Sequence, residues 1–270
     1  MLLIVTDKCS MGCTHCMSDC TPEGKHITME QFKENFEWAL HFIKNQPILI
    51  SGGEPFEHPQ IKEILTYAVD KVNKLCYPNM GLAVITNGWE LRKDQKLYNW
   101  YKEFTKGTTG KWIATQITNV PKYYPVKFTE KDLYWLGKLN RCWICTDEKD
   151  IHLYPQGRAL NLNEPYRTMV PKCTNPKLIA AQLKMKSLFD VNAKKLNIFT
   201  LAEWMSKAGK FCNLRINIDG SLACGESALC PHVGTIHDTP EELFDKILNW
   251  NCIICAKYIN PDEMKLKIVD

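Results

Sequence analysis

Short apolar runs alternate with amphipathic stretches through the first part of the chain. Apolar runs of strand length, rich in branched side chains, cover residues 2–5, 48–50 and 82–85. Apolar residues at helical spacing follow the first two runs, over residues 28–44 and 61–75. A repeat of strand, loop and helix predicts a parallel sheet whose strands are joined by right-handed crossovers.

The repeat continues farther along the chain. Further strands are predicted over residues 112–118, 141–145 and 150–154, with a further helix over residues 131–139. The pattern therefore predicts an α/β fold with six strands in this part of the chain.

Length and composition limit the class of protein. A chain of 270 residues with 45% hydrophobic content can bury one full core and a small satellite domain. The net charge of +4 is mild and forms no basic block, so it does not indicate nucleic acid or an anionic membrane as a partner. No apolar run reaches the length of a membrane span, and the chain opens directly on a strand pattern. We therefore expect a cytoplasmic protein.

Cysteine is unusually frequent, with 13 in the chain. A chain this long without a signal peptide does not fit a secreted disulfide scaffold, so bound metal or clusters in a reducing compartment explain the cysteines better. Cys9, Cys13 and Cys16 follow the first strand at the spacing C-x3-C-x2-C. Loops at the carboxyl ends of strands carry the active sites of barrel-like α/β enzymes, so we expect these thiols in the active site.

Three thiols are one fewer than a closed metal site requires. A structural zinc takes four ligands, and a [4Fe–4S] cluster usually takes four cysteines. With three cysteines, one iron of a cluster keeps a position at which a non-protein ligand can bind. A zinc site or a set of reduced thiols is the simpler alternative. Cys20 follows closely and is a rival fourth ligand, although we interpret it as an ordinary loop cysteine.

Two further motifs stand where the next two strands end. The second strand runs into Ser51-Gly52-Gly53-Glu54-Pro55, and the third into Thr86-Asn87-Gly88. Paired glycines permit a tight turn and the close approach of a ligand to main-chain groups. A plain strand-to-helix turn would explain a lone Gly-Gly pair.

Together, the cysteine triplet and these two motifs resemble the signature of the radical S-adenosylmethionine (radical SAM) enzymes. The resemblance implies that Cys9, Cys13 and Cys16 hold a [4Fe–4S] cluster whose open iron is chelated by the amino and carboxylate groups of SAM. An electron from the cluster then cleaves SAM to methionine and a 5'-deoxyadenosyl radical, which abstracts a substrate hydrogen. The resemblance also implies a partial (β/α)6 barrel.

The same resemblance assigns contacts to SAM. The Gly-Gly-Glu-Pro loop is similar to the family's site for the SAM amino group, and Thr-Asn-Gly is similar to what the family places beneath SAM. His15 stands where the family usually has an aromatic residue near the adenine. Thr115 and Gln116 can reach a ribose hydroxyl, and Arg158 lies in a Gly-Arg-Ala turn similar to those of radical SAM proteins with extra clusters. The residues expected to bind the cofactor are His15, Ser51, Gly52, Gly53, Glu54, Pro55, Thr86, Asn87, Thr115, Gln116 and Arg158.

The last third of the chain has a second set of cysteines. Cys212 and Cys224 frame a predicted hairpin with an Asp-Gly turn, and Cys252 and Cys255 form a C-x2-C pair. Four thiols can close a cluster, although a zinc ribbon uses the same geometry. Beside a radical SAM motif, the arrangement resembles the twitch form of auxiliary-cluster domain, a shortened relative of the SPASM domain. Cys230 is a reserve ligand that could displace one of the four.

The domain organisation follows from these motifs. Cys142 and Cys145 form another C-x2-C pair, but residues three apart in a strand face opposite sides, so we favour buried thiols over half a metal site. The expected units are a radical SAM partial barrel over residues 1–165, a helical bridge or lid over 166–208, a small α+β auxiliary-cluster domain over 209–260 and a C-terminal tail over 261–270.

The resemblance also implies a reaction. We expect SAM cleavage, hydrogen abstraction and transfer of an electron to the auxiliary [4Fe–4S] cluster, with a ribosomally made peptide oxidised or crosslinked. A small-molecule dehydrogenase is the close alternative, and a non-catalytic zinc-binding interaction protein is the alternative from a different class. The first strand begins at Leu2 and leaves no room for a fused leader-peptide domain, so a separate leader-peptide-binding protein is an expected partner. A flavodoxin or ferredoxin is the expected electron donor.

Overall fold

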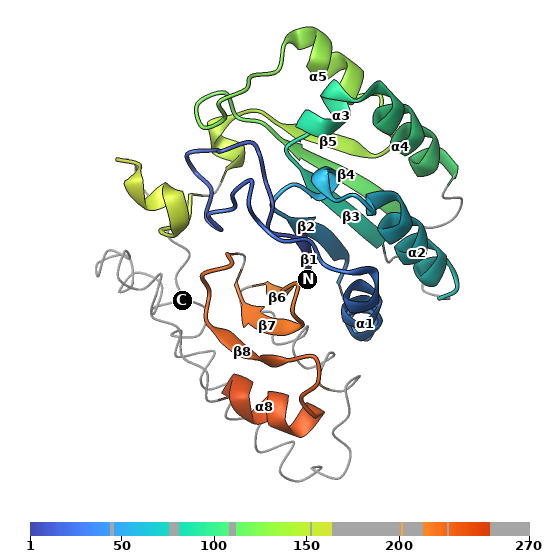
Figure 1. The fold of residues 1–270 in the computed structure, drawn as a ribbon, viewed down its shortest axis with the longest axis vertical. Coiled ribbons are helices and arrows are strands. Elements are labelled where there is room, and N and C mark those ends of the chain that lie inside the picture. Colours follow the sequence, from blue (N-terminus) through green and yellow to red (C-terminus); the bar gives the residue numbers. More distant parts are fainter. Residues whose placement is uncertain are drawn as a thin grey trace, which may run out of the picture.

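A computed structural model describes residues 1–43, 46–75, 81–107, 112–151, 153–163, 201, 213–225 and 227–248. In this described part, eight strands form one sheet in the order β5-β4-β3-β2-β1-β6-β7-β8 (Figure 1). The strands are β1 (Leu2–Thr6), β2 (Ile48–Gly52), β3 (Gly81–Thr86), β4 (Trp112–Thr118), β5 (Cys142–Cys145), β6 (Leu214–Ile216), β7 (Ser221–Cys224) and β8 (His232–Thr235).

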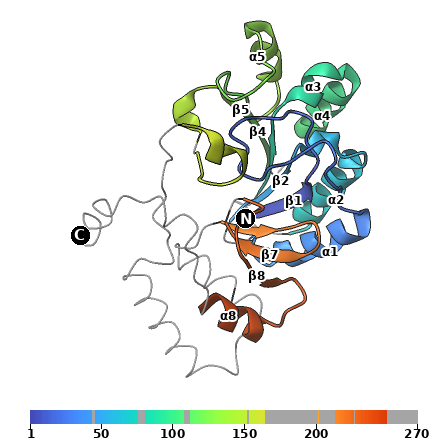
Figure 2. The ribbon, with the colours of Figure 1, turned by 60° about the vertical axis from the view of Figure 1, so that its left-hand side comes forward.

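Helices connect the first five strands, and these strands are all parallel. Helices α1 to α5 lie along one side of the sheet, and Figure 2 shows the N-terminal loop on the other side. The helices are α1 (Met29–Leu40), α2 (Ile61–Asn73), α3 (Trp89–Lys93), α4 (Gln95–Gly107), α5 (Glu130–Leu136) and α8 (Pro240–Leu248), with 3-10 turns η1 (Pro55–Glu57), η2 (Glu148–Asp150) and η3 (Gly157–Asn161).

The N-terminal repeat folds as its apolar pattern predicts. All five residues of β1 are buried, which is typical of a central parallel strand covered on both faces. Helix α1 begins at a reciprocal capping box, in which Thr28 Oγ1 accepts from the main-chain N–H of Gln31 and the Gln31 side chain accepts from Thr28 N. The apolar face of α1 packs Phe32 and Phe36 into the core. The five predicted strands from residue 2 to residue 145 are confirmed.

The predicted sixth strand over residues 150–154 is wrong. The carboxylate of Asp147 accepts a hydrogen bond from the main-chain N–H of Lys149 at 3.1 Å and caps the turn η2. This local side-chain bond gives the backbone an alternative to strand pairing. Ile151 and residues 153–156 lie in no helix or strand, so β5 has no strand on its outer side in the part of the chain that is described.

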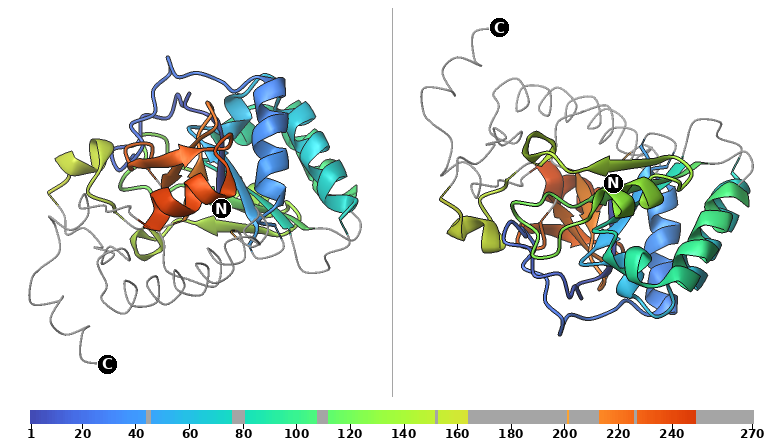
Figure 3. Two further views of the ribbon diagram at one scale, coloured as in Figure 1. Left: turned by 90° about the horizontal axis from the view of Figure 1, so that it is seen from below. Right: turned by 90° about the horizontal axis from the view of Figure 1, so that it is seen from above.

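The C-terminal strands extend the opposite end of the sheet. Strand β6 pairs in parallel with β1, with Leu2 opposite Arg215, and β7 and β8 continue antiparallel. Figure 3 shows this β6–β8 unit beside β1 and α1 from two directions. The predicted Asp-Gly hairpin is confirmed: Gly220 has a φ of +78°, and Asp219 accepts bonds from Ser221 N and Oγ at 3.0 and 2.6 Å. The sheet therefore grows past β1 and stays open.

Two apolar clusters fill the described part. The larger lies between the sheet and its helices, and the smaller gathers Cys9, Cys13 and Cys20 with Tyr123 and Tyr124 on the side of the N-terminal loop. None of the helices seen here has both the length and the apolar character needed to span a bilayer. The predicted domain boundaries stay a prediction, since the bridge over 166–208 and the tail over 261–270 lie almost wholly outside the described residues.

Candidate active site

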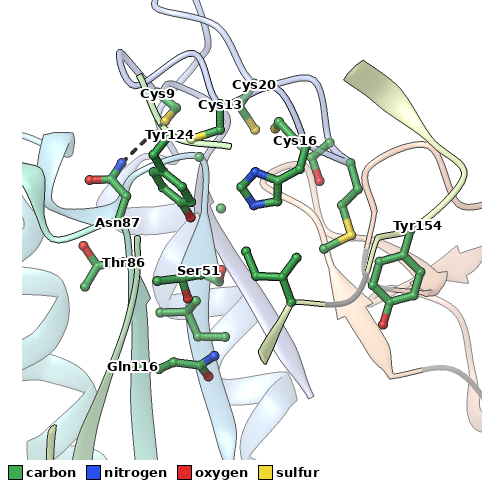
Figure 4. A pocket seen from close by; sticks show the side chains of 18 residues that line it. Cys9, Cys13, Cys16, Cys20, Ser51, Thr86, Asn87, Gln116, Tyr124 and Tyr154 are labelled. Carbon is green, nitrogen blue, oxygen red and sulfur yellow. Dashed lines mark hydrogen bonds between the residues drawn. The ribbon is translucent and has the colours of Figure 1, made fainter. Parts of the chain in front are cut away.

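The carboxyl ends of the parallel strands meet at one cavity of about 280 Å³. The loop after β1 supplies Cys9, Cys13 and Cys16, and the loops after β2 and β3 supply the glycine pair and Asn87. Figure 4 shows the thiols at one end of the cavity, with Ser51 and Gln116 at the other. The volume is near the lower end of the range for small-molecule sites, about 300–1,000 Å³. The strand ends that the sequence marks are therefore brought together in space.

The three triplet thiols fit a cluster ligand set. Burial raises the pKa of Cys9 to about 12 and raises that of Cys13 further. The pKa of Cys16 falls to about 6, because the Cys20 side chain hydrogen-bonds to it. Buried thiols of this kind ionise when a metal supplies the compensating charge, which couples loading to proton release.

The thiols of Cys9, Cys13 and Cys16 are spread along the cavity wall and are not grouped around one point. Among the described side chains, no three His, Cys, Asp or Glu are grouped closely enough to hold a single metal ion. A four-iron cluster takes its ligands at separate corners, so thiols spread around a cavity suit it. The donor set thus fits the cluster that the sequence resemblance implies.

The glycine pair packs β2 against the cysteine loop. A Cβ atom at Gly52 would lie 2.1 Å from Thr6 O, and one at Gly53 would lie 2.1 Å from Lys8 O. The main-chain N–H of Gly53 donates to Thr6 O at 2.7 Å, and that of Glu54 donates to Lys8 O at 2.8 Å. The protein's own loop therefore makes a close approach at these glycines, and the expected approach of a ligand stays a prediction. Both glycines and Ser51 also line the cavity.

Glu54 lies behind the cavity wall. Its side chain is fully buried and accepts hydrogen bonds from Phe56 N, Thr86 Oγ1 and Asn87 N at 3.0, 2.6 and 2.7 Å. Burial raises the pKa of this carboxyl to about 7, although the three bonds act in the opposite direction. Pro55 is buried as the first residue of η1. Glu54 and Pro55 do not line the cavity, and their expected contact with SAM stays a prediction.

Polar groups from β3 and β4 line the side opposite the loop. Thr86, Asn87 and Gln116 all face the cavity, and the Asn87 amide donates to Cys9 Sγ at 3.8 Å. The expected contact of Thr115 with the same ligand stays a prediction, and its side chain does not line the cavity. Neighbouring residues of a strand face opposite sides, and the fully buried Thr115 hydroxyl hydrogen-bonds to the Tyr101 hydroxyl at 2.8 Å.

His15 is held between two aromatic rings. Its ring centroid lies 5.2 Å from that of Tyr123 and 5.1 Å from that of Tyr124. Burial and the nearby charge of Arg158 lower the His15 pKa to about 4, so the ring is neutral at pH 7. Its Nδ1 is the one buried side-chain nitrogen or oxygen without a hydrogen-bond partner among the residues described. A neutral ring that lines the cavity and has one nitrogen without a hydrogen-bond partner fits a site for a flat, polar group such as an adenine.

Arg158 anchors the cysteine loop through hydrogen bonds from outside the cavity. Its Nε donates to Cys13 O at 2.9 Å, and its Nη1 donates to Cys20 O at 3.1 Å and to Asp19 Oδ1 at 2.9 Å. The preceding Gly157 has a φ of +56°, and a Cβ there would lie 2.5 Å from Cys16 O. Arg158 therefore shapes the site through the loop backbone and does not line the cavity itself.

Several cavity residues were not marked by any motif. Tyr124, Ile151 and Tyr154 line it from irregular segments after β4 and β5, and Met17 and Cys20 line it from the cysteine loop. Segments without a periodic pattern give no sequence signal for which side chains face a ligand. The nearness of Cys20 to the triplet was the one available signal.

The C-terminal cysteines are only partly described. Cys224 is buried on β7, 1% exposed, whereas Cys230 accepts a hydrogen bond from the Gln156 amide at 3.6 Å. Cys212, Cys252 and Cys255 lie outside the described residues. Cys142 and Cys145 on β5 are partly exposed, whereas buried thiols are expected from the strand pattern.

Comparisons with known proteins find sequence relatives of the first part of the chain. Residues 3–107 match the Radical SAM superfamily. This part of the chain is therefore similar to a radical SAM domain, and the similarity implies a [4Fe–4S] cluster and SAM at the cavity. The antilisterial bacteriocin subtilosin biosynthesis protein AlbA of Bacillus subtilis (strain 168) is 34% identical over 104 residues, which are 37% of this chain and 21% of AlbA. The chain thus matches about a fifth of that relative's length.

Two solved structures are similar in fold. BtrN in complex with AdoMet and 2-DOIA has a TM-score of 0.50 and 14% identity, with 94% of this chain and 86% of that chain covered. Native anSMEcpe with bound AdoMet and Cp18Cys peptide has a TM-score of 0.51 and 15% identity, with 100% and 83% covered. The expected α/β fold class of radical SAM proteins is confirmed.

Proposed function

We propose that this protein reductively cleaves SAM and uses the resulting radical to oxidise or crosslink a ribosomally made peptide. The observation that carries the proposal is the single cavity at the ends of β1, β2, β3 and β4, which is lined by three cluster-type thiols and by polar groups for a nucleoside. A zinc-binding interaction protein would use the thiols but would not need the polar groups for a nucleoside.

The residues that line the cavity have different roles in this proposal. Cys9, Cys13 and Cys16 would hold the cluster, which supplies together with SAM a 5'-deoxyadenosyl radical that removes a substrate hydrogen. Asn87 orients the Cys9 thiol through its amide, and Gln116 offers hydrogen-bonding groups to a sugar. The rings around the thiols reduce the access of water to the reacting atoms.

A peptide substrate is supported by the named relatives. AlbA is described as a biosynthesis protein for the bacteriocin subtilosin, and the anSMEcpe structure contains a Cp18Cys peptide. The BtrN structure contains 2-DOIA, so a small molecule is the alternative that a substrate test must separate. Incubation of the anaerobically reconstituted protein with SAM, reductant and candidate precursor peptides should give peptide products that have lost hydrogen mass. Turnover of small polyols or amino-sugars with unchanged peptides would favour the alternative.

We further propose that an auxiliary [4Fe–4S] cluster bound by Cys212, Cys224, Cys252 and Cys255 accepts the electron left after hydrogen abstraction. Cys230 is the reserve for one of these four, and its hydrogen bond to Gln156 ties it to the turn that carries Arg158. A variant with Cys9, Cys13 and Cys16 all changed to Ala should keep about half of the wild-type iron if each cluster holds four irons. Zinc in place of iron in that variant would defeat the redox role while leaving the radical SAM domain intact.

Two protein partners belong to the same proposal. A separate leader-peptide-binding protein would deliver the peptide, and a flavodoxin or ferredoxin would supply the electron for SAM cleavage. Pull-down of a tagged precursor peptide with and without this protein separates direct recognition from delivery. Substrate-dependent turnover with reduced flavodoxin in place of dithionite tests the donor.

A further inference from the structure

A fourth thiol faces the cluster cavity. Cys20 is 7% exposed, lines the same cavity as Cys9, Cys13 and Cys16, and packs in the same apolar cluster as Tyr124. Figure 4 shows its sulfur in the row formed by the triplet thiols. Cys20 therefore lies among the triplet thiols, where the sequence suggests an ordinary loop cysteine.

The loop closes on itself and brings Cys20 to this place. The main-chain N–H of Cys9 donates to Thr21 O at 2.9 Å, and Lys8 and Thr21 form a parallel β-bridge. The residue after Cys20 therefore lies against the residue that carries the first thiol. The four cysteines therefore stand on one loop whose two ends lie side by side, and the Cys20 side chain hydrogen-bonds to that of Cys16.

Arg158 fixes the position of Cys20 together with that of Cys13. One guanidinium donates to the carbonyl oxygens of both residues, at 3.1 and 2.9 Å. A planar guanidinium holds its donors in a rigid fork, so the two backbone segments keep their separation. The backbone of Cys20 is therefore anchored by the same side chain that anchors Cys13.

We propose that Cys20 ligates the fourth iron of the cluster while SAM is absent, and that SAM displaces it on binding. A [4Fe–4S] cluster usually takes four cysteine ligands, and a fourth cysteine lines the cavity beside the three expected ligands. The inference rests on the proposed cluster. Cys20 leaves the iron as a thiolate and takes the proton that the amino group of SAM gives up when it binds the metal. No electron moves in this exchange.

The first test uses the wild-type protein. After anaerobic reconstitution with ⁵⁷Fe, Mössbauer spectra without SAM should show irons with thiolate-type coordination only, and a distinct site should appear when SAM is added. A distinct iron site already present without SAM would overturn the inference. If the wild-type protein binds a cluster that already has a distinct iron site without SAM, only the role of Cys20 fails. If it binds no cluster at all, the proposed function fails as well.

The second test uses Cys20→Ser, with Cys142→Ser as the matched control because Cys142 does not line the cavity. Cys20→Ser should show the distinct iron site without SAM and should bind SAM more tightly. If Cys20 holds the iron in about 90% of SAM-free molecules, the apparent Kd should fall about tenfold, because only the competent fraction binds. Cys142→Ser should leave spectrum and Kd unchanged. Equal SAM affinity in wild type and Cys20→Ser would overturn the inference.

Discussion

The carboxylate of Glu54 accepts a 2.6 Å hydrogen bond from the hydroxyl of Thr86, and this contact ties the loop after β2 to the end of β3. The second carboxylate oxygen accepts from Asn87 N at 2.7 Å. Both loops also supply cavity residues, so a single buried side chain sets the spacing of two walls. Glu54 therefore acts on the site through Thr86 and Asn87.

The raised pKa of Glu54 predicts a pH dependence of stability. The folded protein holds this proton up to about pH 7, whereas the unfolded chain releases it near the ordinary value of 4.5. Between these values the folded state binds more protons, so its stability falls as pH rises from about 4.5 to 7. The full effect is about 3 kcal/mol. Urea unfolding across this range should show the decline, and Glu54→Gln should flatten it. The same slope in both proteins would contradict the assignment.

Gly53→Ala should damage the cluster loop. A Cβ at this position would lie 2.1 Å from Lys8 O and 3.0 Å from Cys9 Cβ, so the loop must move. We expect a loss of about 1–3 kcal/mol in the free energy of unfolding together with reduced iron loading. Gly107→Ala is the control, since a Cβ there has no atom within 4 Å. Iron content that matches wild type in Gly53→Ala would show that the loop tolerates the shift.

Arg158→Lys should loosen the cluster without removing a positive charge. Lysine cannot span Cys13 O and Cys20 O with a rigid fork, so both backbone anchors weaken. Each lost charged hydrogen bond is worth about 1.5–3 kcal/mol. Iron should pass to an added chelator faster than in wild type. The control is Arg92→Lys, a half-exposed residue whose Nε lies 3.2 Å from Asp132 Oδ1. Equal release rates in the two variants would count against the clamp.

Gln116 and Thr115 offer a paired test on one strand. Gln116→Ala removes a cavity group and should weaken SAM binding with little change in stability. Thr115→Val removes the buried hydrogen bond to Tyr101 and should lower stability by about 1–3 kcal/mol with unchanged SAM affinity. Calorimetric titration with SAM and urea unfolding measure the two effects. Reversed effects would place Thr115, and not Gln116, at the ligand.

The local pattern predicted much of the sheet and the site. The buried run of β1, the glycine pair after β2 and Thr86-Asn87 after β3 all occupy the expected strand ends. Periodicity succeeds here because each strand and helix buries a face set by its own sequence. It fails where one side chain decides the outcome, as when Asp147 caps η2 in place of a sixth strand.

Long-range pairing was beyond the sequence pattern. On its second side, β1 pairs with β6, which lies more than 200 positions away in the chain. Neither strand's sequence indicates this pairing. The place of Cys20 likewise depends on the hydrogen bond from Cys9 N to Thr21 O, which spacing alone does not reveal. The motif singles out Glu54, but only the structure shows that its carboxylate accepts hydrogen bonds from Thr86 and Asn87.

The most direct test of the central claim is SAM cleavage by anaerobically reconstituted protein. With dithionite and SAM, the brown wild-type protein should form 5'-deoxyadenosine, and Cys13→Ala should form none, because the cluster needs that thiolate in place. Liquid chromatography with mass detection measures the product, and metal analysis of the same samples measures iron and zinc. A colourless wild-type protein that retains only zinc and yields no 5'-deoxyadenosine would contradict the account.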